Sequence, residues 1–108
     1  MTSPPADVTD ETFEADVLAS ELPVIVDFWA PWCRPCKAIE RSLVEIADAN
    51  EGRVRLVKLD IDVNLRTPAR YGVLSIPTVI LFAGGEPRET VVGARPKGHF
   101  ERTFAPHL

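Results

Sequence analysis

Hydrophobic residues form two long stretches of this chain that predict neighbouring strands. The run at 23–30, PVIVDFWA, is almost entirely apolar, which is typical of a strand buried on both faces of a sheet. Polar residues interrupt the run at 54–61, VRLVKLDI, which predicts a second strand. Shorter runs at 78–82 and 89–92 predict two more strands, and Gly84 and Gly85 suit a tight hairpin between them.

Apolar residues at helical spacing predict helices around these strands. Asp10 can cap a first helix with Phe13, Val17 and Leu18 on its apolar side, and Pro23 closes that segment. A long amphipathic helix is predicted to begin at Cys33, and its apolar positions are Cys36, Ile39, Leu43, Ile46 and Ala47.

Two shorter helices are predicted further along the chain. Thr67 has the character of an N-cap and Pro68 that of a first helical residue, and Gly72 can end this helix. Pro96 opens the last helix, in which Phe100 and Phe104 lie one turn apart and face the core.

The order of the elements predicts an α/β layered domain. The first two strands should pair in parallel through a right-handed crossover, and the last two should form an antiparallel hairpin. A chain of 108 residues suffices for one core. We expect residues 1–6 to be a loose N-terminal segment and residues 7–108 to form the domain.

Charge and composition exclude several classes of partner. The net charge of −4 argues against nucleic acid, because phosphate binding requires a basic surface. The first residues contain neither the basic nor the apolar region of a signal peptide, and the apolar runs are too short to span a membrane. The expected compartment is therefore the reducing cytoplasm.

The stretch WCRPCK contains the only two cysteines, Cys33 and Cys36. A structural disulfide across so small a ring would contribute only about 2 kcal/mol, and the cytoplasm would reduce it. A zinc site requires about four ligands. The other candidate ligands, His99 and His107, lie far along the chain, so neither interpretation is favoured.

Dithiol–disulfide exchange explains the position of the pair better. At the start of a helix, free N–H groups and the positive end of the helix dipole favour the thiolate of Cys33, which is the nucleophilic form. Cys36 lies one turn further on the same face and is expected to be the more buried thiol. One thiol can therefore attack a disulfide while the other resolves the product.

The motifs VDFWAPWCRPCK, KLDID, YGVLSIPTVILF, GGE and VVGARP resemble, in this order, the successive signatures of the thioredoxin family. The resemblance implies the thioredoxin fold, a central mixed β-sheet of four to five strands flanked by helices on both faces. It also implies that the chain reduces disulfides in client proteins without a bound cofactor. A separate NADPH-dependent flavoenzyme, a thioredoxin reductase, would recycle it.

Asp27 is a carboxylate inside an otherwise apolar strand. Burial there would raise its pKa and make it a proton acceptor near neutral pH, although a solvated or paired aspartate is the simpler alternative. The resemblance implies that Asp27 takes the proton from Cys36, and that Lys58 in the neighbouring strand modulates Asp27.

The resemblance also implies a surface for client proteins. Statistics alone predict a trans Ile76–Pro77 bond, whereas family members have a cis proline here, facing the thiols. The backbone of Ile76 could then pair with an extended client segment. The expected docking surface comprises Trp32, Ile76, Pro77, Val92, Gly93 and Ala94.

Two positions depart from the common family pattern. Arg34 stands where glycine is usual, and a cation beside Cys33 should stabilise the thiolate and make the disulfide more oxidising. Arg34 and Pro35 are therefore expected to tune the reduction potential. Arg41 stands where many relatives have a proline that kinks the long helix.

Three other functions are compatible with these residues. The first is a more oxidising disulfide oxidase or isomerase, favoured by Arg34. The second is a subunit of a larger assembly that uses the fold for binding alone. The third is carriage of a metal or cluster between two chains, each giving two thiolates. The leading prediction remains a monomeric protein-disulfide reductase.

Overall fold

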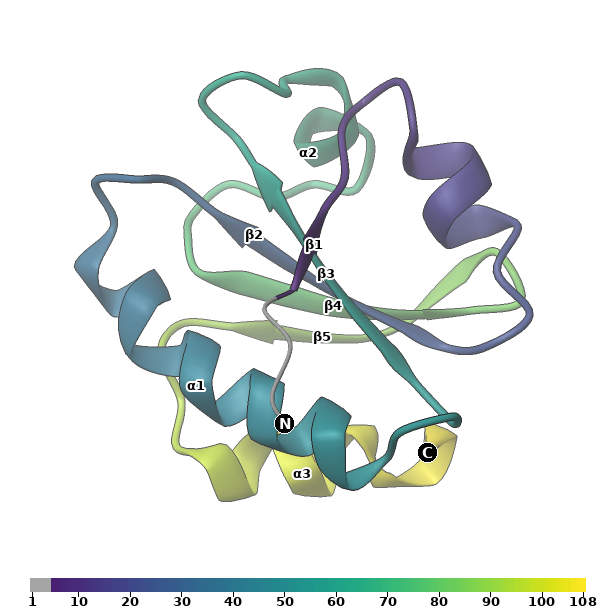
Figure 1. Cartoon of the computed structure of the whole chain (residues 1–108). Coiled ribbons are helices and arrows are strands. Elements are labelled where there is room, and N and C mark those ends of the chain that lie inside the picture. The colour runs from purple at the N-terminus through teal and green to yellow at the C-terminus, as the bar shows by residue number, and fades with distance from the viewer. Residues whose placement is uncertain (1–4) are drawn as a thin grey trace.

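The computed structural model describes residues 5–108, which form one sheet with helices on both faces (Figure 1). The strand order is β1-β3-β2-β4-β5. Strand β3 pairs in parallel with β1 and β2, whereas β4 is antiparallel to both β2 and β5. The strands are β1 (Ala6–Asp7), β2 (Val24–Trp29), β3 (Arg55–Asp60), β4 (Thr78–Ala83) and β5 (Glu86–Val92). The predicted mixed sheet is confirmed.

Helices cover the two faces of the sheet unequally (Figure 1). The long helix α1 (Arg34–Ala49) and α3 (Lys97–Phe104), which continues into the 3₁₀ turn η2 (Ala105–His107), lie on one face. The single-turn π-helix η1 (Glu14–Leu18) and α2 (Arg66–Arg70) lie on the other. The predicted arrangement of helices on both faces is therefore also confirmed.

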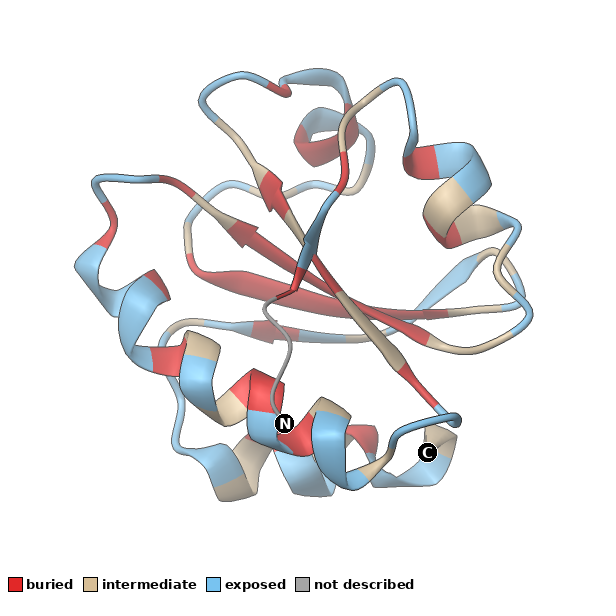
Figure 2. Cartoon of the chain, in the orientation of Figure 1, coloured by how far each residue is buried: buried red, intermediate tan, exposed pale blue. Residues whose placement is uncertain are grey.

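Strand β2 is the centre of the core, and Figure 2 shows it buried over most of its length. Its side chains alternate between the two faces of the sheet. Val26 and Phe28 pack with Phe13 and Val17 on the η1 side. Ile25 packs on the other side with apolar residues of α1 and α3, which include Ile39, Leu43, Phe100 and Phe104. Asp27 occupies this second face between Ile25 and Trp29, on the side covered by α1.

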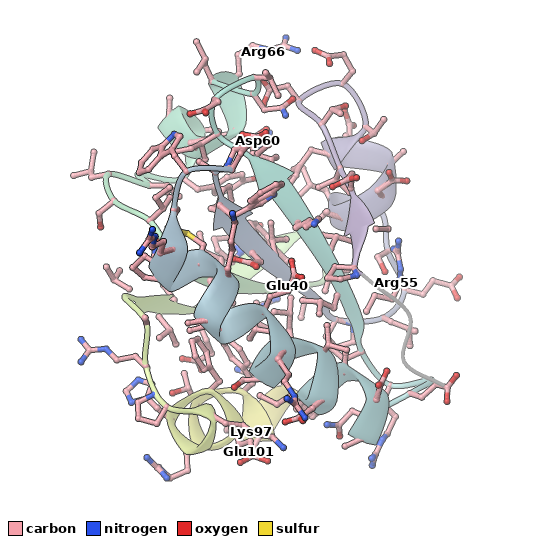
Figure 3. The ribbon with its side chains drawn as sticks, turned by 60° about the vertical axis from the view of Figure 1, so that its left-hand side comes forward. Glu40, Arg55, Asp60, Arg66, Lys97 and Glu101 are labelled. Atoms are coloured by element: carbon pink, nitrogen blue, oxygen red, sulfur yellow. A yellow bond between two sulfur atoms is a disulfide. The ribbon has the colours of Figure 1, made fainter. Side chains whose placement is uncertain are left out.

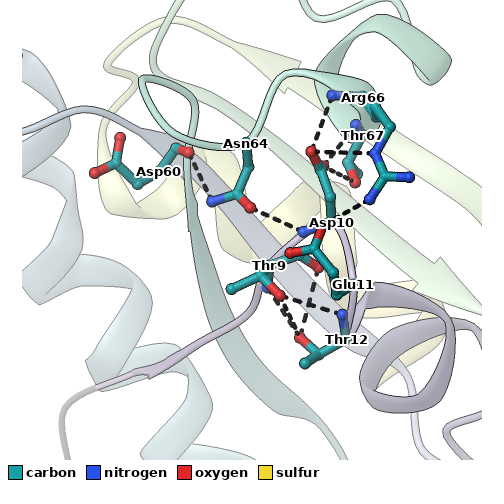
Figure 4. A network of polar contacts seen from close by, with 8 residues as sticks. All are labelled: Thr9, Asp10, Glu11, Thr12, Asp60, Asn64, Arg66 and Thr67. Atoms are coloured by element: carbon teal, nitrogen blue, oxygen red, sulfur yellow. Dashed lines mark hydrogen bonds and ion pairs between the residues drawn. The ribbon is translucent and has the colours of Figure 1, made fainter.

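Asp10 does not cap the first helix, so this prediction is wrong. Helix η1 follows Phe13 without a side-chain cap. The Asp10 carboxylate instead accepts hydrogen bonds from the N–H groups of Arg66 (3.1 Å) and Thr67 (2.9 Å) and from the Thr67 hydroxyl (2.6 Å) (Figure 4). Asp10 therefore caps α2, an element far along the chain that local spacing could not identify.

Helix α2 begins earlier than predicted. Its first residue is Arg66 and its N-cap is Leu65, so Thr67 is not the cap. Thr67 and Pro68 are instead buried in the first turn, where the Thr67 hydroxyl contacts Asp10. Gly72 follows the end of the helix with a φ of 68°, which fits its predicted role as terminator.

Strand β1 extends into the N-terminal segment that was expected to be loose. Ala6 pairs with Val57 and Asp7 with Lys58 on β3. A two-residue strand has no periodicity from which it could be predicted. Residues 1–4 of the expected loose segment lie outside the described residues.

Candidate active site

The two cysteines lie at the start of α1, just beyond the end of β2. Cys33 is the N-cap of the helix, and its Sγ accepts a hydrogen bond of 3.2 Å from the Cys36 N–H. Pro35 is tolerated in the first turn, because N–H groups there have no acceptor within the helix. Cys33 and Cys36 form a disulfide with their Cα atoms 5.4 Å apart. The helix thus begins where the sequence predicts.

Both sulfurs are well covered in this disulfide form. Cys33 is 3% exposed and Cys36 is 2% exposed, so the expected difference in burial between them is absent. They cluster with Ala30, and partly buried side chains pack against the group: Trp29, Ile61 and Ile76. The disulfide therefore lies within this cluster.

Asp27 is buried in the middle of β2 with an exposed fraction of 1%. Within residues 5–108, its Oδ1 atom has no hydrogen-bond partner. The pKa of Asp27 is raised from its usual value of 3.8 to about 7. Burial is the largest cause, the Glu40 carboxylate also raises the pKa, and the Lys58 ammonium lowers it. The side chain therefore exchanges a proton near neutral pH, as a general acid–base group must.

Lys58 lies opposite Asp27 in the register of β2 and β3. Its Nζ atom nevertheless contacts Glu40 Oε1 at 3.4 Å and lies 4.6 Å from the centre of the Trp29 ring. Within residues 5–108, no ion pair joins Lys58 to Asp27. Sequence reasoning missed Glu40, although its position four residues after Cys36 places both on the same side of α1.

A second loop approaches the thiols from the start of β4. The Ile76–Pro77 peptide bond is cis, the isomer that the family resemblance implies. Pro77 is buried, and its carbonyl accepts a hydrogen bond of 2.9 Å from the Gly93 N–H. This bond and the pairing of Thr78 with Val92 bring the segment after β5 alongside the proline. The fold thus places Pro77, Val92 and Gly93 side by side, next to Ile76, which packs against the two cysteines.

Several apolar side chains are exposed in the segments that contain the predicted docking residues. Trp32 is 66% exposed, and its Nε1 donates to both carboxylate oxygens of Asp62 at 3.1 Å. Val92 is 51% exposed, and Ala94 is exposed beside it. Leu74, two residues before Ile76, is 97% exposed. The sequence did not indicate that Leu74 would be exposed, because a leucine in a loop cannot be distinguished from a core leucine by its pattern.

The two arginines that depart from the family pattern are both exposed. Within residues 5–108, no ion pair or hydrogen bond engages the Arg34 guanidinium. Arg41 pairs with Glu45 at 3.4 Å along an uninterrupted α1, and Glu45 also contacts Lys97 of α3 at 3.2 Å. In Figure 3, Lys97 lies near Glu101 at the end of the molecule away from the disulfide.

Two general features of the described chain bear on the site. Across residues 5–108, no cluster of three or more histidine, cysteine, aspartate or glutamate side chains could hold a metal ion. None of the helices in this range has both the length and the apolar character needed to cross a membrane.

Comparisons with known proteins agree with this geometry. The Thioredoxin family model matches residues 4–105. A thioredoxin of Streptomyces clavuligerus is 58% identical over 90 residues, which cover 83% of each chain. Thioredoxin 1 of Nostoc sp. is 47% identical over 103 residues, covering 95% of this chain and 96% of that protein.

A plant protein is also similar. The chloroplastic M-type thioredoxin of Brassica napus is 48% identical over 90 residues, which cover 83% of this chain and 51% of that protein. The matches and the Cys33–Cys36 pair identify the chain as a thiol–disulfide oxidoreductase with protein-disulfide reductase activity. Thioredoxins generally need no bound cofactor, and the family implies disulfide-containing client proteins and a reductase as partners. The chain belongs to the thioredoxin family.

Proposed function

We propose that Cys33 is the nucleophile of the reductase and Cys36 the resolving thiol. In the reduced protein, the Cys33 thiolate attacks a client disulfide, forms a mixed disulfide and releases the first client sulfur as a thiolate. The single observation that carries this assignment is the N-cap position of Cys33. The Cys36 N–H already donates to its sulfur at 3.2 Å, and such a donor stabilises a thiolate.

Asp27 accepts the proton of Cys36 in the second step, directly or through a water molecule. The Cys36 thiolate then attacks the Cys33 sulfur, the bond from Cys33 to the client breaks, and the second client thiolate leaves. The client gains two electrons and the Cys33–Cys36 disulfide forms. A carboxyl with a pKa of about 7 suits this transfer, because its ionised and protonated forms are both populated near neutral pH. Lys58 modulates Asp27 from the neighbouring strand.

Clients bind along the cis-proline loop. Within residues 5–108, the N–H and carbonyl of Ile76 have no backbone hydrogen-bond partner, so they are free to pair with an extended client segment. Trp32, Val92, Gly93 and Ala94 complete the docking surface, and the buried Pro77 positions Gly93 through its carbonyl. Exposed apolar side chains beside a reactive disulfide support this function.

A flavoenzyme of the thioredoxin-reductase type recycles the disulfide, and NADPH supplies the electrons through that enzyme. We expect the protein to act in the cytoplasm as a monomer, without nucleic acid or membrane partners. Arg34 and Pro35 tune the reduction potential from the first turn of α1. The alternatives, a redox-independent binding subunit or a more oxidising oxidase or isomerase, are not favoured by the comparisons.

An insulin-reduction assay with and without a recycling flavoenzyme tests the proposal. Cys33→Ser should abolish turnover. Cys36→Ser should accumulate a mixed disulfide with the client, because the second step is lost. Turnover by Cys33→Ser, or trapping through Cys36 in place of Cys33, would contradict the assignment of the two thiols.

A further inference from the structure

Among residues 5–108, Asp27 and its neighbour Lys58 do not form a buried ion pair. Lys58 is the direct neighbour of Asp27 across β2 and β3, yet its ammonium bonds to Glu40 at 3.4 Å. Asp27 is 1% exposed and one of its oxygens has no partner within residues 5–108. A buried carboxylate ordinarily takes up an adjacent cation, because an unpaired charge is costly in the interior.

We propose that Glu40 is a positioning residue of the active site, which holds the Lys58 ammonium away from Asp27 and so leaves this buried carboxyl without a charge partner. Figure 3 shows Glu40 on the side of α1 that faces β3. The inference rests on the proposed function, in which Asp27 accepts the proton of Cys36.

Few charged groups face Asp27 from the elements that pack around it. Strand β3 contributes Lys58, and α1 contributes Glu40. Strand β4 places the apolar Val79 opposite Asp27. Asp7 of β1 lies beyond Lys58 in the register and is exposed. Burial is the largest cause of the raised pKa of Asp27, and Glu40 and Lys58 are the two charged groups that modify it.

The pair has a chemical consequence for the second step. If the ammonium moved to Asp27, it would stabilise the carboxylate and make it a weaker base. Glu40 keeps Asp27 a stronger base in two ways. It engages the Lys58 ammonium, and it adds its own negative charge near Asp27. The Lys58 side chain is 21% exposed, so it is sufficiently buried for its position to matter.

The test is an NMR titration of the Asp27 carboxyl in the disulfide form of Glu40→Gln protein. Loss of the Glu40 charge should lower the midpoint by roughly half a pH unit or more, because Lys58 becomes free to approach Asp27. Glu45→Gln is the matched control: it removes a carboxylate from the same helix, one that pairs with Arg41 and Lys97. Its midpoint should equal that of the wild type.

A Lys58→Met background separates the effect of Glu40 through Lys58 from the direct effect of the Glu40 charge on Asp27. If Glu40 acts by holding the ammonium, Glu40→Gln should shift the Asp27 midpoint less in this background than in the wild type. An equal shift in both backgrounds would overturn the proposal, as would an unmoved midpoint in Glu40→Gln alone.

Failure of this inference can be distinguished from failure of the proposed function. Asp27→Asn protein that releases clients as fast as the wild type would remove Asp27 from the mechanism, whatever Glu40 does. A slow Asp27→Asn protein, combined with an unmoved midpoint in Glu40→Gln, would contradict only the role of Glu40.

Discussion

Two aspartates of this chain, the partly buried Asp10 and the buried Asp27, have opposite surroundings. The side chain of Asp10 is 8% exposed and receives hydrogen bonds from Thr67 and Arg66. Burial alone would raise its pKa, but these hydrogen bonds and the Arg66 charge outweigh burial, and the net pKa is lowered. Asp27 is 1% exposed, lacks such donors, and has a pKa raised to about 7.

The difference shows how one functional group can serve structure in one place and chemistry in another. A carboxylate that is fully satisfied remains ionised and holds two segments together, as Asp10 joins the first loop to α2. A carboxyl that is buried without donors is destabilised as an anion and exchanges a proton near neutral pH. Ionised Asp27 therefore lowers the free energy of unfolding, and the same burial gives it a pKa suited to proton transfer.

The largest effect on stability is expected for Asp27→Asn. The folded-state pKa lies above the usual 3.8, so ionisation of Asp27 progressively destabilises the fold as pH rises from about 4 to about 7. The full shift corresponds to roughly 4 kcal/mol as an upper limit. Asp27→Asn should therefore gain up to about 4 kcal/mol in denaturant unfolding at about pH 8, and little at about pH 4. An equal gain at both pH values would break the comparison.

The opposite sign is expected for Asp10→Ala. Loss of this cap should reduce the free energy of unfolding by about 1–2 kcal/mol at neutral pH. Because the pKa of Asp10 is lowered, its contribution is present above the usual pKa and is lost as pH falls through the folded-state value. Glu11→Ala is the control, since Glu11 is 73% exposed and contacts only the exposed Arg66 guanidinium. It should change stability by less than about 0.5 kcal/mol.

Thr67→Val sharpens the comparison with a smaller change. The substitution keeps the shape of the side chain and removes one of the donors to Asp10, the hydroxyl at 2.6 Å. Unfolding measurements should show a loss of about 1 kcal/mol at neutral pH, because the two backbone donors remain. A loss as large as that of Asp10→Ala would mean that the hydroxyl alone provides the cap.

The smallest effect is expected for the exposed Arg34, which follows Cys33, and concerns the reduction potential. Arg34→Gly removes a cation beside Cys33 that solvent screens. A glutathione-equilibrated titration should show a reduction potential lowered by roughly 10 mV, with a smaller fraction of thiolate at neutral pH. An unchanged or raised potential would contradict the assigned role of Arg34.

The sequence predicts the main elements because their signals are local. The apolar run around Asp27, the Gly84–Gly85 hairpin and the helix starting after Cys33 all follow from neighbouring residues. The two glycines have φ values of 62° and 78°, as such a tight turn requires. The position of Cys33 at a helix start, on which the chemistry depends, was therefore visible without a structure.

Predictions failed where the partner of a residue lies far away in the chain. Asp10 and Thr67 each have the character of an N-cap, and nothing in the local pattern indicates that one bonds to the other. Glu40 could be placed near Cys36 on α1, but its contact with Lys58 depends on how the helix crosses β3. Side-chain pairing between elements is set by packing, which spacing alone does not specify.

The pH dependence of client release from the Cys33 mixed disulfide tests most directly whether Asp27 accepts the proton of Cys36. The wild-type rate should fall as pH decreases below about 7, where Asp27 becomes protonated. Asp27→Asn protein should release the client at least about tenfold more slowly at neutral pH and lose this dependence. Release by Asp27→Asn at the wild-type rate, with the same pH profile, would contradict the account.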